Sequence, residues 1–140
     1  SAAIDNSRKD QTLNTPALAT IIMAERQVRW LLQCGGMDAV SAHCAQASSL
    51  IYDWAEANLA ARPFVDNPAW RSPVTATIEI NEAASVSELA AHLRARGIVD
   101  IGAYRGVGTN QLRIGTWPSV EVDDVEALLA CIDYCLERVL

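Results

Sequence analysis

The chain has 140 residues, of which 51% are hydrophobic and 20% are charged, and its formal net charge is −6. This composition is typical of a globular domain with a real core and excludes an intrinsically disordered chain. The acidic balance argues against nucleic acid, whose phosphates need a basic face, and no apolar run is long enough to span a membrane, so we expect neither partner.

The first part of the chain is predicted to be an extended segment followed by two helices. Residues 1–14 are mostly polar, and we expect them to be extended. A helix is predicted from Asn14-Thr15-Pro16 onward, because Asn and Thr can cap a helix and Pro is tolerated in its first turn. Gly35-Gly36 ends this helix. From Met37 to about Asn58, apolar residues recur in steps of three and four, which predicts a long amphipathic helix.

The hydrophobic period changes in the second half of the chain. Residues 62–73 contain three prolines and are predicted to form a loop. Apolar residues then alternate with polar ones from Val74 to Ile80, which predicts a half-buried strand. The pattern Ser85-Val86-Ser87-Glu88 is a capping box, and it opens a helix that is expected to end at Gly97.

The remaining residues complete a small sheet. Residues 98–101 are a short strand candidate, residues 102–110 a glycine-containing loop, and residues 112–117 a clear strand. Asp123, with Glu126 three residues later, is predicted to cap a final helix. From residue 63 onward this order describes an α+β fold in which two helices cover one face of a small sheet. The first 36 residues have no strand of their own to pack on, which indicates that they belong to something larger.

The cysteines do not form a metal-binding pattern. Cys34, Cys44, Cys131 and Cys135 include no CxxC pair, so we predict no metal site. Buried free thiols in a reducing cytoplasm are the better account of all four. The sequence also contains no nucleophile elbow or P-loop, and neither His43 nor His92 is expected to act as a base.

Three places could bind an anion. Asn14 and Thr15 at a helix start could bind a phosphate, or they could be a plain N-cap. Tyr104-Arg105 lies at the edge of the glycine loop, where Arg105 could hold a phosphate or carboxylate or could simply be solvated. Arg113 lies in an otherwise apolar strand, where Gly115 leaves room beside the guanidinium; it could bind a carboxylate or point outward from the sheet.

Several stretches resemble one family, the phosphoserine aminotransferases of the class V aminotransferases, especially the actinobacterial type. The stretch from Asp5 to Ala17, DNSRKDQTLNTPA, resembles the NSRK-QT-NTPA segment of that family. Four further stretches resemble the C-terminal end of the same family: Gly97-Ile98-Val99-Asp100, Tyr104-Arg105, the run NQLRIG from Asn110 to Gly115, and Asp123-Asp124-Val125. Tyr52-Asp53-Trp54-Ala55 and Arg62-Pro63-Phe64-Val65 fit as well, so the resemblance covers essentially the whole chain.

The resemblance implies a fold-type-I aminotransferase that binds pyridoxal 5'-phosphate and acts as a homodimer. Such an enzyme converts 3-phosphohydroxypyruvate and glutamate into O-phosphoserine and 2-oxoglutarate in serine biosynthesis in the cytoplasm. Residues 1–36 would then be the C-terminal remnant of the large cofactor-binding domain. Residues 37–140 would be the small C-terminal domain, including the long connecting helix.

The resemblance also implies roles for individual residues. Asn14 and Thr15 would bind the cofactor phosphate across the dimer interface, and Arg113 would hold the α-carboxylate of the substrate. Arg105 and Tyr104 would lie near the distal phosphate of the substrate. Tyr104 departs from the His-Arg pair that is common there, because tyrosine can donate a hydrogen bond but cannot become cationic.

The same resemblance implies that this chain alone is inactive. The Schiff-base lysine of the family, the aspartate facing the pyridinium nitrogen and the aromatic residue stacked on the ring lie upstream of the segment that matches Ser1. Lys9 is the only lysine of the chain and does not match the catalytic position. We therefore assign no catalytic residue and expect the isolated chain not to bind the cofactor. Two alternatives stay open: a free-standing α+β module for ligand binding or oligomerisation, and another class V aminotransferase.

Overall fold

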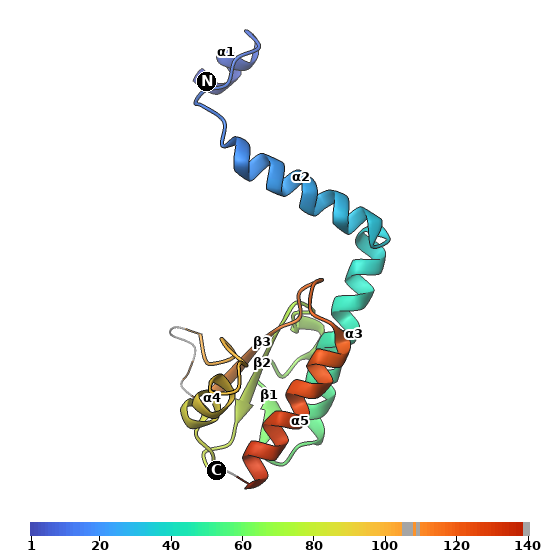
Figure 1. Cartoon of the computed structure of the whole chain (residues 1–140), viewed down its shortest axis with the longest axis vertical. Coiled ribbons are helices and arrows are strands. Elements are labelled where there is room, and N and C mark those ends of the chain that lie inside the picture. Colours follow the sequence, from blue (N-terminus) through green and yellow to red (C-terminus); the bar gives the residue numbers. More distant parts are fainter. Residues whose placement is uncertain (105–107, 109, 139–140) are drawn as a thin grey trace. The chain divides into compact units, whose positions relative to one another are not determined.

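The computed structural model describes residues 1–104, 108 and 110–138. The chain divides into two compact units, Ser1–Met37 and Asp38–Leu140. Figure 1 shows the elements of both units in chain order. The first unit is helical, and the second is a three-stranded antiparallel sheet with helices, which confirms the predicted α+β class. No helix in the described ranges is both long and apolar enough to cross a membrane.

The first unit begins with a helix that the sequence pattern did not predict. Helix α1 (Ala2–Ser7) replaces the expected extended segment. Two alanines favour the helix, Asp5 lies in its first turn, and the Arg8 guanidinium lies 3.8 Å from the Asp5 carboxylate. The prediction of an extended segment was wrong because a short polar stretch carries no apolar period from which a helix could be recognised.

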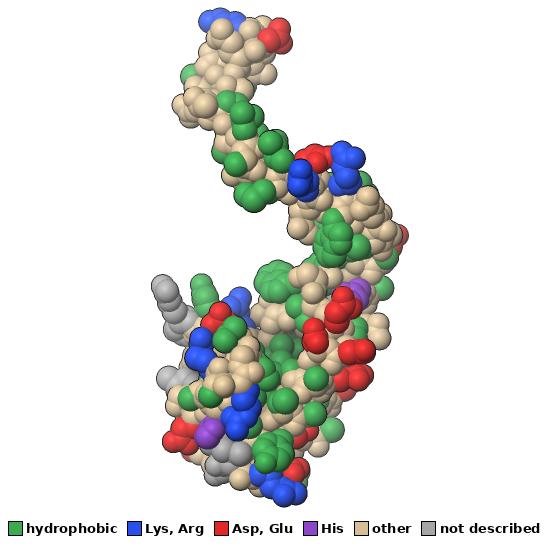
Figure 2. Space-filling view, viewed as in Figure 1, with side chains coloured by type: hydrophobic (Ala, Val, Ile, Leu, Met, Phe, Trp, Pro, Cys, Tyr) green, Lys and Arg blue, Asp and Glu red, His purple; other side chains and the backbone are tan. Residues whose placement is uncertain are grey.

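Helix α2 (Leu18–Gln33) starts later than expected. Its N-cap is Ala17, which provides no side-chain cap, so Asn14 and Thr15 lie upstream of the helix and do not cap it. The reason is Pro16, which disfavours the α conformation at the residue before it. Neither α1 nor α2 contains a buried residue. Hydrophobic side chains are therefore visible along α2 in Figure 2, and the exposed ones are Leu18, Ile21, Ile22, Met23, Val28, Trp30 and Leu32.

Helix α3 (Gly36–Ala57) is the predicted long helix. Gly35 and Gly36, which precede and begin it, have φ values of 104° and 75°, a region that favours glycine. From Cys44 onward the helix buries one face. Trp54 and Asn58 both donate a hydrogen bond to Asp133 Oδ1, each at 2.9 Å, so this end of the helix is tied to the last helix of the chain.

The sheet has the strand order β1-β2-β3, with both pairs antiparallel. Strand β2 (Thr75–Ile80) and strand β3 (Gln111–Gly115) lie where strands were predicted. Strand β1 (Ala61–Pro63) and the 3-10 helix η1 (Pro68–Trp70) fall in the predicted loop. A proline is tolerated in β1 because this strand lies at the sheet edge and pairs only with β2 in the described part of the chain.

The predicted strand at residues 98–101 is not formed. This segment makes a single ladder-like hydrogen bond, from the Arg113 N–H to the Ile101 carbonyl at 2.8 Å. Helix α4 (Val86–Arg94) begins as predicted, since Ser85 Oγ accepts a hydrogen bond from the Glu88 N–H. Helix α5 (Val122–Arg138) already includes Asp123, which therefore lies in its first turn and does not cap it.

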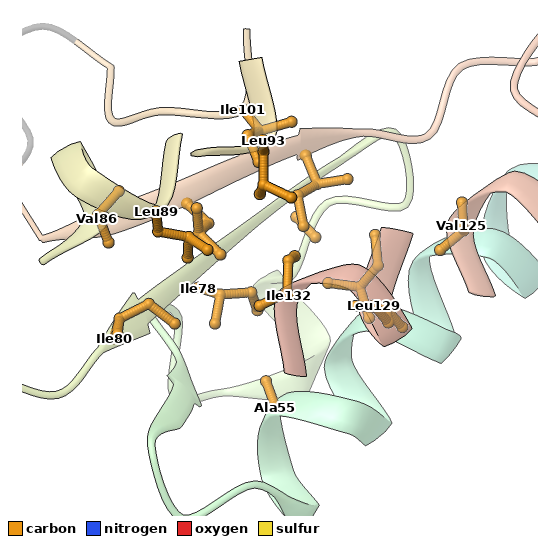
Figure 3. Close-up of a cluster of buried hydrophobic side chains, with 14 of the residues drawn as sticks. Ala55, Ile78, Ile80, Val86, Leu89, Leu93, Ile101, Val125, Leu129 and Ile132 are labelled. Carbon is orange, nitrogen blue, oxygen red and sulfur yellow. The ribbon is translucent and has the colours of Figure 1, made fainter. Parts of the chain in front are cut away.

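The core of the second unit lies between one face of the sheet and three helices. Ile78 of β2, Leu89 of α4 and Ile132 of α5 are fully buried and point toward one another in Figure 3. Ile51 and Ala55 add the buried face of α3 to the same cluster. The sequence predicted only two covering helices, because α3 precedes the region in which the sheet was recognised. The opposite face of the sheet carries the polar residues of β2 and β3.

Candidate functional site: the polar face of the sheet

The polar face of the sheet brings together charged residues from all three strands. Arg113 of β3 lies opposite Thr77 of β2 in the strand register. Two residues further along β2, Glu79 lies opposite Arg62 of β1 and forms an ion pair with it. Helices cover the other face, so the alternation of β2 and β3 that builds the core also places these polar side chains on this face.

Arg113 is exposed and stacks on an aromatic ring. Its Cζ atom lies 4.8 Å from the centroid of the Tyr104 ring, a distance typical of a cation–π contact. Within the described residues the Arg113 guanidinium forms neither an ion pair nor a side-chain hydrogen bond. Its five N–H donors are therefore available, in a planar arrangement that matches a carboxylate. The structure thus brings two predicted site residues, Tyr104 and Arg113, into contact.

The segment that carries Tyr104 is held alongside β3 by two anchors. Ile101 is only 7% exposed and belongs to the core, while its carbonyl accepts the hydrogen bond from the Arg113 N–H. Asp100 has a φ value of 61°, and its carboxylate accepts a hydrogen bond from Arg94 at 2.8 Å. Tyr104 follows Ile101 by three residues, so its ring can reach the side chain of Arg113. The other predicted residue of this segment, Arg105, lies outside the described residues.

A second arginine–tyrosine pair shows what is particular to Arg113. The Arg71 Cζ atom lies 5.1 Å from the centroid of the Tyr52 ring, but Arg71 also forms an ion pair with Glu56 at 2.5 Å and donates to the Val65 carbonyl. Burial raises the pKa of the Tyr52 phenol above its ordinary value of 10.0, against the opposing Arg71 charge and the hydrogen bond to the Ser72 carbonyl. In this pair Tyr52 is buried, Arg71 is largely buried, and the guanidinium already has partners. The guanidinium of Arg113 is exposed and has no such partner among the described residues.

Gly115 does not leave space beside Arg113 as the sequence interpretation assumed. A Cβ atom at Gly115 would lie only 2.6 Å from Nε1 of Trp117, so the indole fills the place that a larger residue would occupy. Trp117 is itself 51% exposed. The absence of a side chain at position 115 thus allows the indole to fold back over the strand that carries Arg113.

Asn110 fixes the start of β3 and was not recognised from the sequence. Its Nδ2 donates to the carbonyls of Ile80, Asn81 and Ala84 at 2.8–3.0 Å, and its Oδ1 accepts from the Val86 N–H at 2.9 Å. One side chain therefore joins the end of β2, the start of α4 and the start of β3. The only signal in the sequence is an asparagine that follows a glycine-containing loop and precedes a strand.

Asn14 and Thr15 lie in the first unit and are exposed. Neither side chain makes a hydrogen bond within the described residues, so an amide and a hydroxyl are free to bind a phosphate. This donor set fits the phosphate end of pyridoxal phosphate. Lys9 is exposed in the turn that follows α1, a solvated setting unlike the buried one in which a lysine becomes a nucleophile.

The cysteines and histidines show no arrangement that indicates a reaction centre among the described residues. Cys44 and Cys135 are buried, but Cys34 and Cys131 are exposed, so the expectation of four buried thiols was wrong. Both exposed thiols lie on surfaces that the helical periodicity did not distinguish from the buried ones. His43 is half-buried, with Nε2 2.8 Å from the Val120 carbonyl, and His92 is half-buried on α4. The described part of the chain contains no cluster of side chains suited to a metal ion.

The chain is similar to phosphoserine aminotransferases in sequence and in fold. No protein-family model matches it. The putative phosphoserine aminotransferase of Mycolicibacterium vanbaalenii is 49% identical over 136 residues, which are 97% of this chain and 37% of the relative. The phosphoserine aminotransferase of Rhodococcus jostii is 45% identical over 136 residues, 97% of this chain and 36% of the relative.

Solved structures show the same fold. A phosphoserine aminotransferase of Cytophaga hutchinsonii superimposes with a TM-score of 0.80 at 20% identity, covering 98% of this chain and 36% of that one. The pyridoxal-phosphate-bound phosphoserine aminotransferase of Trichomonas vaginalis has a TM-score of 0.74 at 18% identity, covering 91% of this chain and 36% of that one. The chain spans about 36–37% of the length of the two curated relatives described above. By sequence it matches the C-terminal portion of curated phosphoserine aminotransferases.

Proposed function

We propose that this chain is the substrate-carboxylate-binding part of a phosphoserine aminotransferase. The whole enzyme would transfer the amino group of glutamate to 3-phosphohydroxypyruvate in serine biosynthesis, as a cytoplasmic homodimer with pyridoxal phosphate. The observation that carries the proposal is the exposed Arg113, which stacks on Tyr104 and has no carboxylate partner among the described residues. It lies on a chain that is 43–49% identical to curated members of the family.

Arg113 would bind the α-carboxylate that both substrates share. A guanidinium and a carboxylate form two parallel charge-assisted hydrogen bonds, which fix the orientation of the substrate as well as its position. The strand supports this role because Arg113 is held by its backbone N–H on one side and by the β2 register on the other. A rigid strand places a binding group more accurately than a loop does.

The remaining predicted residues would act at the two phosphates. Arg105 and Tyr104 would lie toward the distal phosphate of the substrate, and Asn14 and Thr15 would donate hydrogen bonds to the cofactor phosphate in the neighbouring subunit. When bound, pyridoxal phosphate supplies the electron sink that lets an amino group move between substrates. No residue of this chain is proposed to bind it covalently, since Lys9 is exposed.

The exposed apolar residues of α2 support assembly over a free-standing module. Seven large hydrophobic side chains of this helix are at least 36% exposed in the described structure. Exposure of so many large apolar side chains on one helix is typical of an interface. A ligand-binding domain that works alone would not need it, so we favour the aminotransferase over the alternative of an independent module.

A chimeric enzyme tests the proposal. The matching segment of the Rhodococcus jostii enzyme is replaced by this chain, and phosphoserine formation from glutamate and 3-phosphohydroxypyruvate is measured. We expect activity, and an Arg113→Gln variant should lower kcat/KM about 100-fold, since losing a bidentate charge-assisted pair costs about 3 kcal/mol.

Arg96→Gln is the matched control, because Arg96 is exposed and donates only to the His92 carbonyl at 2.9 Å. This variant should keep kcat/KM within about twofold of the parent chimera. A folded, cofactor-loaded chimera in which both variants behave alike would refute the role of Arg113.

A further inference from the structure

The contact between Tyr104 and Arg113 engages the ring of the tyrosine and leaves its hydroxyl free. The Arg113 Cζ atom lies 4.8 Å from the ring centroid, while the Tyr104 hydroxyl makes no hydrogen bond within the described residues. Tyr104 is 59% exposed, so the ring is a surface group and is not needed for the core. The Tyr104 ring therefore contacts Arg113 without contributing to the core.

Stacking and carboxylate binding use different parts of the guanidinium. The ring contacts the flat face of the group, whereas all five N–H bonds lie in its plane. A carboxylate can thus bind at the edge while the ring remains on the face. A nearby acidic residue would instead occupy the N–H edge, as Asp100 does for Arg94 and Glu56 does for Arg71.

An exposed arginine without a partner samples many rotamers, and a ligand that binds it must first order the side chain. An aromatic platform restricts these rotamers before the ligand arrives, and preorganisation of this kind strengthens binding. The backbone of the platform is itself fixed, because Ile101 is buried and its carbonyl is bonded to the Arg113 N–H at 2.8 Å.

We propose that Tyr104 is a positioning residue whose ring fixes the plane of the Arg113 guanidinium, so that the N–H edge is presented to a substrate carboxylate. The inference rests on the proposed function, and it assigns the effect of Tyr104 to its ring. The hydroxyl group is not required for this role. Phenylalanine should therefore replace Tyr104, and leucine should not.

The test uses the 140-residue chain labelled with ¹⁵N at its arginines. Nuclear magnetic resonance follows the Arg113 Nε–Hε signal in the parent chain, Tyr104→Phe and Tyr104→Leu, with glutamate as the probe ligand. The signal should be shifted by the ring and restricted in motion in the parent and in Tyr104→Phe. In Tyr104→Leu it should resemble that of a solvated arginine, and glutamate should bind about 2- to 5-fold more weakly.

The outcomes distinguish the role of the Tyr104 ring from the role of Arg113 in binding a carboxylate. Equal glutamate affinity in all three proteins, or equal loss in the Phe and Leu variants, would overturn the role of the ring, and the second result would assign it to the hydroxyl. The carboxylate site itself is tested in the chimeric enzyme: Tyr104→Leu there should raise the KM for glutamate about 2- to 5-fold and Tyr104→Phe should not, whereas an unchanged kcat/KM in Arg113→Gln would overturn the site. Arg96 serves as the internal reference in every spectrum, since it lies on the turn after α4 and its signal should not change.

Discussion

The two units of the chain have similar helical sequence patterns but differ completely in burial. Ser1–Met37 contains no buried residue, whereas Asp38–Leu140 contains the whole described core. Helices α2 and α5 both have apolar residues at helical spacing. Only α5 buries such residues within its own unit. Hydrophobic periodicity therefore predicts a helix but does not show what the apolar face of that helix packs against. A helix of this length is marginal without such packing.

The largest expected effect contrasts one isoleucine from each unit. Ile78→Ala removes a fully buried side chain and should lower the free energy of unfolding by about 2–5 kcal/mol. Ile22→Ala removes a side chain that is 56% exposed, and it should change the same quantity by less than about 0.5 kcal/mol. Urea unfolding followed by circular dichroism measures both. Similar losses in both variants would show that α2 is packed in solution.

Two asparagines give the next contrast. Asn110→Ala removes four hydrogen bonds that join β2, α4 and β3, and it should cost about 1–3 kcal/mol of stability. Asn14→Ala removes an exposed side chain without a hydrogen-bond partner in the described residues, and we expect no measurable change in the same urea titration. Wild-type stability of Asn110→Ala would mean that water replaces these bonds at no cost.

Alkaline pH should weaken the second unit through Tyr52. Burial raises the pKa of this phenol in the folded state, so the unfolded chain releases the proton first as the pH rises. The contribution of the protonated Tyr52 phenol to the free energy of unfolding is fully present below the ordinary pKa of 10.0. It is lost as the pH rises through the higher pKa of the folded state.

Measurement of stability between neutral pH and strongly alkaline pH should therefore show a smaller decline in Tyr52→Phe than in the parent. Tyr134→Phe is the control, because Tyr134 is 61% exposed. A decline that persists unchanged in Tyr52→Phe would assign the alkaline sensitivity to other groups.

The smallest effect is expected at Gly115. An alanine Cβ there would lie 2.6 Å from Trp117 Nε1, so Gly115→Ala should displace the indole, with a stability loss below about 1 kcal/mol because Trp117 is half exposed. The indole N–H resonance of Trp117 reports the displacement. Gly102→Ala is the matched control, since its added Cβ meets nothing within 4 Å. An unchanged resonance in Gly115→Ala would contradict the contact.

The elements predicted well from the sequence are those whose pattern is complete within one segment. Strand β2 alternates over its whole length, and α4 has both its capping box and its apolar face. Strand β1 was missed because three residues that include a proline become a strand only through pairing with β2. The start of α2 was placed too early because Pro16 acts on the residue before it.

The candidate site could be predicted only in part. Arg113 and Tyr104 were singled out by residue type and by family resemblance, but their contact depends on how residues 98–104 pack along β3. That packing arises from one buried side chain, Ile101, and from one backbone hydrogen bond, neither of which has a local sequence pattern. Asn110 was missed for the same reason, since its four partners are 24–30 residues away in the sequence.

The way in which Ile101 and Asn110 are held has a consequence for how this fold can diversify. Both ends of the intervening stretch are fastened to the core, one through a buried side chain and the other through a hub of hydrogen bonds. Substitutions between them at positions other than Tyr104 should therefore leave the strand that carries Arg113 in register. Under the proposed function, relatives with a different sequence between these two residues would still hold the backbone of Arg113 at the same place in the sheet.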